Sequence, residues 1–187
     1  VNATDSAKIN TVGAMCSSSP AITLNTYLTA GSTPGGTWSG TGVNVISSTF
    51  NPTGLNGTYQ ITYTVNYISG ASNCPISQTN SITVNATPAA PTVTTPISYC
   101  QNATANALIA SGTNLLWYTT ATGGTGSATA PTPNTTTSGN TNYYVSQTIL
   151  NCESPRANIV VTVNAIPTLN PARPQALLSV CSTTRLG

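Results

Sequence analysis

The chain has 187 residues, no histidine and only six charged side chains: Asp5, Lys8, Glu153, Arg156, Arg173 and Arg185. So few basic groups exclude a phosphate-neutralising surface and hence a nucleic-acid partner, and no apolar run reaches the 18 or so residues of a membrane span. Without histidine, without a Cys-x-x-Cys pair and with only two carboxylates, the composition predicts no enzyme, no metal site and no cofactor.

The N-terminal stretch, "VNATDSAKINTV", has no signal-peptide pattern and resembles the start of a mature protein. We therefore expect an interior piece of a longer, secreted chain. Thr, Ser, Asn and Gln must supply its solubility in place of charge.

Apolar residues alternate with polar ones in several short segments, which is the pattern of half-buried strands. The predicted strands are Ala21–Leu28, Tyr59–Tyr67, Asn80–Ala86 and Asn158–Asn164. No segment has a sustained helical period. Short strands between Gly-, Pro- and Asn-rich turns predict an all-β sandwich.

Internal similarity indicates that one module occurs twice. Trp38 and Trp117, the two tryptophans, are 79 residues apart (117 − 38). The same offset relates Val84 to Val163. Further correspondences are Asn85 with Asn164, Pro88 with Pro167, Cys16 with Cys100, Cys74 with Cys152, Tyr63 with Tyr143 and Val65 with Val145.

The repeat predicts two modules, residues 1–87 and 88–166, followed by residues 167–187 as the start of a truncated third module or a tail. The Pro-rich stretch from Asn85 to Pro96 separates the first two. Because proline favours extended connectors, we expect two tandem immunoglobulin-like β-sandwich modules in an elongated arrangement.

Each complete module has one pair of cysteines, and disulfides persist in oxidising compartments. The even count predicts the pairs Cys16–Cys74 and Cys100–Cys152; the alternative is two buried free thiols per module. Cys181 has no predicted partner within this chain.

The tryptophans have two interpretations. A Cys–Trp–Cys order is typical of an immunoglobulin-like core, in which Trp38 and Trp117 pack against the opposite sheet with Tyr63 and Tyr143. Alternatively, exposed tryptophans stack on sugar rings, and the platform is extended by Tyr118, Tyr143 and Tyr144.

Two segments, "YCQNATANALIASGTNLLWYTTATGGTG" and "YYVSQTILNCESPRANIVVTVNAIP", resemble the Ig-like repeats of very large Bacteroidetes cell-surface adhesins of the SprB gliding-motility type. The resemblance covers Pro91–Pro167, and "GGTWSGTGV", "FNPTGLNGTYQITYTV" and "CPISQTNSITVNA" in the first module resemble a sister repeat. It implies a secreted, surface-anchored protein exported by the type IX route. The C-terminal sorting domain of such adhesins is absent from this chain, which suits a fragment.

The resemblance also implies that the disulfide ties the first strand to the last hairpin of the sandwich. Asp5-Ser6-Ala7 resembles the O-glycosylation signal of that phylum, which makes Ser6 a candidate site. For the Asn-x-Ser/Thr sequons we favour unmodified turns. These sequons begin at Asn2, Asn56, Asn85, Asn102 and Asn134.

Three functions are compatible with these features. The leading hypothesis is a structural repeat in an extracellular adhesin stalk or filament, with neighbouring modules and surface glycans as partners and no membrane insertion. The second is a carbohydrate-binding module that uses exposed Trp and Tyr side chains. The third is an ice-binding face in the Thr-rich stretch Thr119–Gly139, whose spacing is irregular. An isopeptide-stapled module is rejected because Lys8 is the only lysine.

Overall fold

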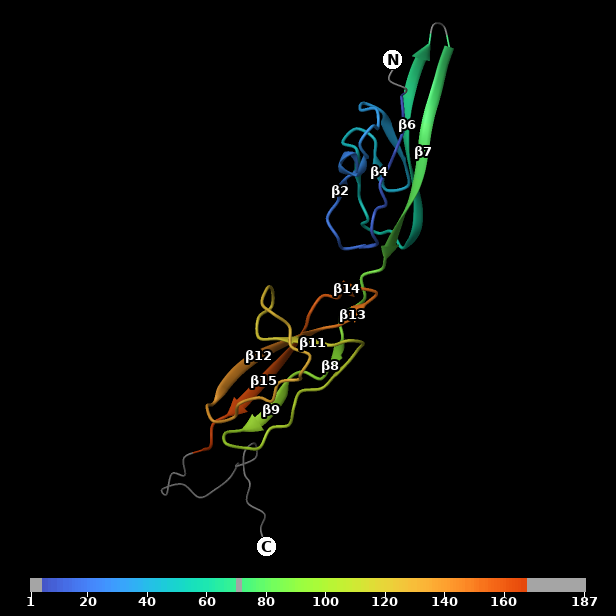
Figure 1. The fold of residues 1–187 in the computed structure, drawn as a ribbon. Helices are drawn as coiled ribbons and strands as arrows, with labels where there is room; N and C mark the ends of the chain where they lie inside the picture. The colour runs from blue at the N-terminus through green and yellow to red at the C-terminus, as the bar shows by residue number, and fades with distance from the viewer. Residues whose placement is uncertain (1–4, 70–71, 168–187) are drawn as a thin grey trace, which may run out of the picture. The chain divides into compact units, whose positions relative to one another are not determined.

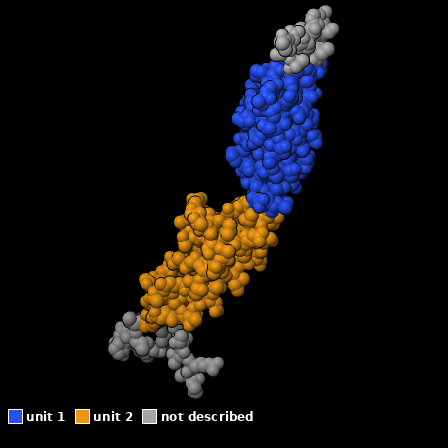
Figure 2. Space-filling view, viewed as in Figure 1, with its two compact units in different colours: residues 1–87, 150–152 blue, residues 88–149, 153–187 orange. Residues whose placement is uncertain are grey.

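The computed structural model describes residues 5–69 and 72–167. The chain divides into two compact units (Figure 2), unit 1 comprising Val1–Thr87 and Leu150–Cys152, and unit 2 comprising Pro88–Ile149 and Glu153–Gly187. No α-helix occurs in the described ranges, so the expected all-β class is confirmed.

Unit 1 contains a four-stranded sheet and a three-stranded sheet (Figure 1). The larger sheet has the order β1 (Met15–Cys16), β7 (Ser72–Asn85), β6 (Gly57–Ser69) and β3 (Thr37–Gly40). The smaller has the order β2 (Ile22–Thr23), β5 (Thr49–Phe50) and β4 (Val43–Asn44).

The unit 1 core consists of the inward residues of the predicted period-2 strands. Ile61, Tyr63 and Val65 of β6 are buried, as are Ile82 and Val84 of the antiparallel β7. Burial of such side chains provides the main driving force for folding, about 1.5–3 kcal/mol for each large apolar residue. Leu24, Trp38 and Phe50 belong to the same buried cluster, as do Ala7, Ile9 and Val12 of the N-terminal segment.

The prediction of one strand over Ala21–Leu28 is wrong. Only Ile22–Thr23 is extended, and a single 3₁₀ turn, η1, follows over Leu24–Tyr27. Within this turn the Thr26 hydroxyl donates to the Thr23 carbonyl at 2.7 Å. Threonine side chains that bond nearby backbone in this way compete with strand pairing, and the turn still buries Leu24 completely.

Unit 2 has a comparable four-stranded sheet and two smaller pairings (Figure 1). The four-stranded sheet has the order β11 (Leu116–Tyr118), β12 (Gly139–Ser146), β15 (Ala157–Asn164) and β9 (Ile97–Cys100). The pairs are β8 (Thr92–Val93) with β10 (Ala110–Ser111), and β13 (Thr148–Ile149) with β14 (Cys152–Glu153).

The unit 2 core follows the same alternation. Ile159, Val161 and Val163 of β15 are buried, as predicted for Asn158–Asn164. Val145 of β12 is also buried, and Trp117 lies opposite it on β11. The connection between β11 and β12 contains the Thr-rich stretch and returns to the sheet through a bridge between Trp117 and Ser127.

The pairing registers of the two units support the repeat. In each unit a short cysteine-bearing strand runs parallel to a long strand, with Cys16 opposite Asn85 and Cys100 opposite Asn164. Parallel pairing of a short cysteine-bearing strand with the last strand of the module's main sheet is thus shared by both units.

One part of the sequence alignment is wrong. Tyr63 lies opposite Trp38, whereas Val145 lies opposite Trp117, so Tyr63 corresponds to Val145 and not to Tyr143. Tyr143 corresponds instead to Ile61 of the first module, since Gly57 pairs with Val84 as Gly139 pairs with Val163. Both strands contain the pattern Tyr-x-Val, at Tyr63–Val65 and at Tyr143–Val145. Alignment of these two patterns displaced the predicted register by two residues.

The division between units falls between Thr87 and Pro88, at the position where the sequence places the module boundary. β7 ends at Asn85 and β8 begins at Thr92, so the second half of the Pro-rich stretch belongs to unit 2. Residues 168–187, for which the sequence predicts a third module or a tail, lie outside the described residues.

Candidate functional site

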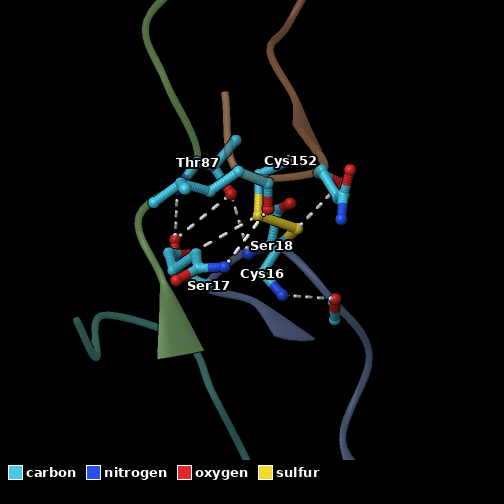
Figure 3. Close-up of a disulfide and its surroundings, with 9 residues drawn as sticks. Cys16, Ser17, Ser18, Thr87 and Cys152 are labelled. Carbon is cyan, nitrogen blue, oxygen red and sulfur yellow. Dashed lines mark hydrogen bonds between the residues drawn. A yellow bond between two sulfur atoms is a disulfide. The ribbon is translucent and has the colours of Figure 1, made fainter. Parts of the chain in front are cut away.

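A disulfide joins Cys16 to Cys152 (Figure 3). Both predicted pairings, Cys16–Cys74 and Cys100–Cys152, are therefore wrong. Cys16 lies opposite Asn85 at one end of β7, and Cys74 lies eleven positions earlier (85 − 74) on the same strand. At roughly 3.3 Å per residue this is about 36 Å, far beyond the 7 Å or so that a disulfide can span.

Hydrogen bonds fix the backbone around Cys16. The Ser17 amide donates to the Asn85 carbonyl at 2.8 Å, and the Ser19 amide donates to the Cys16 carbonyl at 2.9 Å. The Thr87 hydroxyl accepts from the Ser18 amide at 3.0 Å, and Ser17 and Thr87 share further bonds (Figure 3). The cysteine therefore lies in a rigid corner between the ends of β1 and β7.

Cys152 is presented by a tight hairpin, β13–β14. Its two central residues, Leu150 and Asn151, have φ values of 50° and 62°. Two-residue hairpins of type I′ require positive φ at both positions, and a leucine there is uncommon. Strained backbone of this kind is concentrated at functional sites. We therefore assign this hairpin tip and Cys16 as the candidate functional site.

The hairpin tip is packed into unit 1 as well as cross-linked to it. The Asn85 side-chain amide donates to the Leu150 carbonyl at 3.2 Å. The Cys16 sulfur lies 3.6 Å from the Asn151 carbonyl oxygen, and Cys152 is fully buried. Leu150–Cys152 consequently belongs to unit 1, although its sequence lies within the second repeat.

Glu153, the residue after Cys152, is anchored in unit 2. Its Oε1 accepts hydrogen bonds from the hydroxyls of Tyr118 and Ser146, each at 2.6 Å. Arg156 lies over the Tyr118 ring, with its guanidinium carbon 3.3 Å from the ring centroid, and donates to the Thr120 carbonyl at 2.7 Å. The anchor cluster, Tyr118, Ser146, Glu153 and Arg156, thus holds the base of the hairpin on β11 and β12.

The same contacts tune the charge of Glu153. The hydrogen bond from Ser146, then that from Tyr118, lowers the pKa of the carboxyl below its ordinary value of 4.5, and the charge of Arg156 acts in the same direction. A carboxyl with a lowered pKa stays ionised at neutral pH and is a poor general acid. The cluster is suited to holding structure and not to proton transfer.

The aromatic residues form cores and not a sugar-stacking platform. Trp38 and Tyr63 are buried with ring centroids 4.9 Å apart, and the Trp38 indole N–H donates to Asn25 Oδ1 at 2.7 Å. Trp117 is 5% exposed, and the guanidinium of Arg156 covers one face of Tyr118. The structure therefore contradicts stacking on exposed tryptophans.

Two shallow grooves of about 550 and 370 Å³ nevertheless flank Trp117 in unit 2. Leu108 and Leu115 line the larger groove, and Thr125 and Thr129 line the smaller. The smaller groove therefore has hydroxyl-bearing residues beside Trp117. Tyr143 and Tyr144, the other two members of the predicted platform, are half-buried on β12 and line neither groove.

The other predicted site residues are the remaining cysteines and the candidate glycosylation residues. Cys100 is disulfide-bonded, and the side chain of Cys74 and all of Cys181 lie outside the described residues. Ser6 is half-buried, and its carbonyl accepts from the Thr33 amide at 2.8 Å. Asn2 is not described, Asn85 is half-buried, and Asn56, Asn102 and Asn134 are exposed.

Within residues 5–69 and 72–167 no three His, Cys, Asp or Glu side chains are placed to share a metal ion. None of the helical turns in these ranges has the length and apolarity needed to cross a bilayer. The sequence identified Cys16 and Cys152 but missed the anchor cluster. The signal for it was that two of only six charged residues, Glu153 and Arg156, lie within four positions after Cys152.

Residues 88–165 match the family described as Ig-like domain, CHU_C associated. The match supports an Ig-like module in the second repeat, and together with the all-β structure it bears out the predicted fold class. No curated protein matches the chain significantly.

Three solved structures show distant similarity. Drosophila N-cadherin EC1-4 is 12% identical with a TM-score of 0.31; the match covers 82% of this chain but only 49% of that one. The tandem Ig repeats of Dlar are 11% identical with a TM-score of 0.29, covering 85% and 96%. The Bacteroides ovatus mixed-linkage glucan utilization locus protein SGBP-B, in complex with a mixed-linkage heptasaccharide, is 12% identical with a TM-score of 0.27, covering 84% and 67%.

Proposed function

We propose that the chain is a pair of structural repeat modules from a secreted cell-surface adhesin or filament, in which they form part of an extracellular stalk. The observation that carries the proposal is the disulfide from Cys16 to Cys152, which bonds the first strand of one repeat to a hairpin of the next. Such a covalent tie suits a chain that must stay assembled outside the cell, where disulfides persist.

The chemistry of the described residues supports a structural function. The largest side chains, Trp38, Tyr63 and Phe50, are buried in a core, and the Glu153 carboxylate is engaged by two hydroxyls. The match to an Ig-like domain also supports it. Resemblance to gliding-motility adhesins suggests export by the type IX route and a role in surface adhesion, in which many weak contacts act together.

Surface labelling of the producing bacterium tests this proposal. Antibodies raised against the purified chain are expected to label intact cells, and external protease is expected to remove the signal. A strain that lacks type IX secretion should lose the surface signal. Labelling that appears only after lysis would contradict a cell-surface function.

The smaller groove beside Trp117, which Thr125, Ser127 and Thr129 line, favours a second function, namely weak binding of a glycan by polar groups of the groove rather than by stacking on exposed tryptophans. Binding of the chain to soluble glycans and insoluble polysaccharides should be measured with monomeric and multimerised protein. Thr125→Trp fills the smaller groove, whereas Ala121→Trp in the same loop lies outside both grooves and serves as the control. Equal binding by both variants would eliminate the smaller groove as the site.

A further inference from the structure

The disulfide closes most of the described chain into a ring. Cys16 and Cys152 are 136 positions apart in sequence, yet their Cα atoms are 5.5 Å apart. The ring contains every strand from β2 to β13. We propose that the Cys16–Cys152 bond is a mechanical bypass: tension along the chain passes directly between these cysteines and leaves residues 17–151 unloaded. This inference rests on the proposed stalk function.

The argument depends on covalent connectivity. Tension between the two ends of a chain is carried by the shortest covalent path, and a longer parallel branch stays slack. An extended chain spans roughly 3.3–3.6 Å per residue, so the branch between the cysteines could stretch to roughly 470 Å. The disulfide holds the ends of that branch at a Cα separation of 5.5 Å. Non-covalent contacts inside the ring consequently bear little of the load.

On the N-terminal side, tension reaches Cys16 through a short segment that is bonded to unit 1. The Asn10 amide donates to the Tyr27 carbonyl at 2.7 Å, and the Thr29 amide donates to the Lys8 carbonyl at 3.1 Å. Rupture of these bonds would release only the residues that precede Cys16. The pairing of β6 with β7, which holds the main sheet of unit 1, lies wholly inside the ring.

On the C-terminal side, tension leaves Cys152 through Glu153, which the anchor cluster holds in unit 2. The Ser154 amide adds a bond to the Gln147 carbonyl at 2.9 Å. The chain then enters β15, which is paired on both sides, with β12 and β9. Load therefore passes through β14 and β15, whereas the strands of unit 2 from β8 to β13 lie within the ring.

Single-molecule stretching of the full chain, held by peptide tags at both termini, tests the bypass. In non-reducing buffer, the extension of the wild-type chain should be limited to that of the residues outside the ring. Addition of the reductant TCEP should add roughly 470 Å of contour length as the two units unfold. The triple variant Cys16→Ser/Cys100→Ser/Cys152→Ser, which also lacks the disulfide of Cys100, should give the same added length without reductant.

Cys100→Ser is the matched control, because it removes another disulfide-bonded cysteine and leaves the ring intact. In non-reducing buffer, the extension of Cys100→Ser should still be limited to that of the residues outside the ring. If the triple variant extends without force peaks because it does not fold, the reduced wild-type chain still decides the question.

An equal contour length for the wild-type chain with and without reductant would overturn the proposal. Because the measurement uses the isolated chain, its outcome is independent of surface labelling. Failure of the labelling experiment would remove the stalk function and leave the bypass, whereas failure here would remove only the bypass.

Discussion

The two units place a tryptophan at the same position of the same sheet but support it differently. In unit 1, Trp38 faces Tyr63, whose hydroxyl donates to the Thr33 carbonyl and accepts from the Gly36 amide, each at 2.8 Å. In unit 2 the facing residue is Val145, which has no polar group to offer. The repeat therefore preserves the position of the large residue in the core and not its contacts.

This difference extends to the surroundings. A Cβ on Gly36 would lie 2.5 Å from the Thr64 carbonyl oxygen and 2.6 Å from Cζ of Tyr63, so the first unit is closely packed there. The second unit has grooves beside Trp117 and places its polar bonding outside the core, in the anchor cluster. In unit 1 these hydrogen bonds stabilise the core, whereas in unit 2 they hold the hairpin that carries Cys152.

The largest expected effect is that of Trp38→Ala and Trp117→Ala. Each change should reduce the free energy of unfolding of its own unit by about 3–5 kcal/mol, because a large buried side chain leaves a cavity. Urea unfolding is followed by circular dichroism and by fluorescence of the remaining tryptophan, which reports on the other unit. If Trp38→Ala shifts the Trp117 transition equally, the two units unfold as one.

A smaller effect is expected for Tyr63→Phe. The change leaves the Gly36 amide and the Thr33 carbonyl without their partner in a closely packed region, which should cost about 1–3 kcal/mol. Tyr59→Phe is the control, since the Tyr59 hydroxyl bonds only to the exposed Asn56. Chemical denaturation measures the free energy of unfolding of both variants. Equal losses would show that the buried Tyr63 hydroxyl stabilises the unit no more than the exposed Tyr59 hydroxyl does.

Arg156→Ala tests the anchor cluster of unit 2. Loss of the cation over Tyr118 and of the bond to the Thr120 carbonyl should lower the free energy of unfolding of this unit by about 0.5–1 kcal/mol, measured by thermal unfolding. Lys8→Ala, which removes an exposed cation from unit 1, should leave the stability of unit 2 unchanged. If both variants melt at the same temperature as the wild-type chain, the Arg156 contacts do not stabilise unit 2.

The smallest effect concerns pH. Because the pKa of Glu153 is lowered in the folded chain, its contribution to stability is present above the unfolded value and is lost as pH falls through the folded value. The group is exposed, so solvent screening limits the contribution to less than about 1 kcal/mol. Between neutral pH and pH 3, the midpoint temperature of thermal unfolding should decrease less for Glu153→Gln than for the wild-type chain. Equal decreases would show that another group causes the acid sensitivity.

The long strands could be predicted from sequence because alternation over Tyr59–Tyr67 and Asn158–Asn164 is a local signal. The short elements could not: Leu24–Tyr27 forms a 3₁₀ turn because a local threonine bond and burial of Leu24 override the apparent alternation. The register of Tyr63 depends on its pairing with Trp38, which is a long-range contact.

The candidate site was predicted only in part. Cysteine number indicated disulfides, but pairing within each module assumed that a repeat is closed on itself. The length of β7 contradicts this assumption, since it separates Cys74 from Cys16. The charged pair Glu153 and Arg156 marks the place of the anchor cluster in the sequence. Its partners Tyr118 and Ser146 lie on two different strands, so the local pattern could not identify them.

The strand order has a consequence for aggregation. An edge strand with free hydrogen-bonding groups can recruit another sheet, and proteins usually protect such edges with charge. Here β1 pairs with β7 only at Val84 and Asn85, and β3 pairs with β6 only over Ile61–Thr64, so both long strands extend well beyond their short edge partners. In a chain with only six charged side chains, charge gives these stretches little protection, and we expect contact between sheets to be favoured where many copies are crowded together.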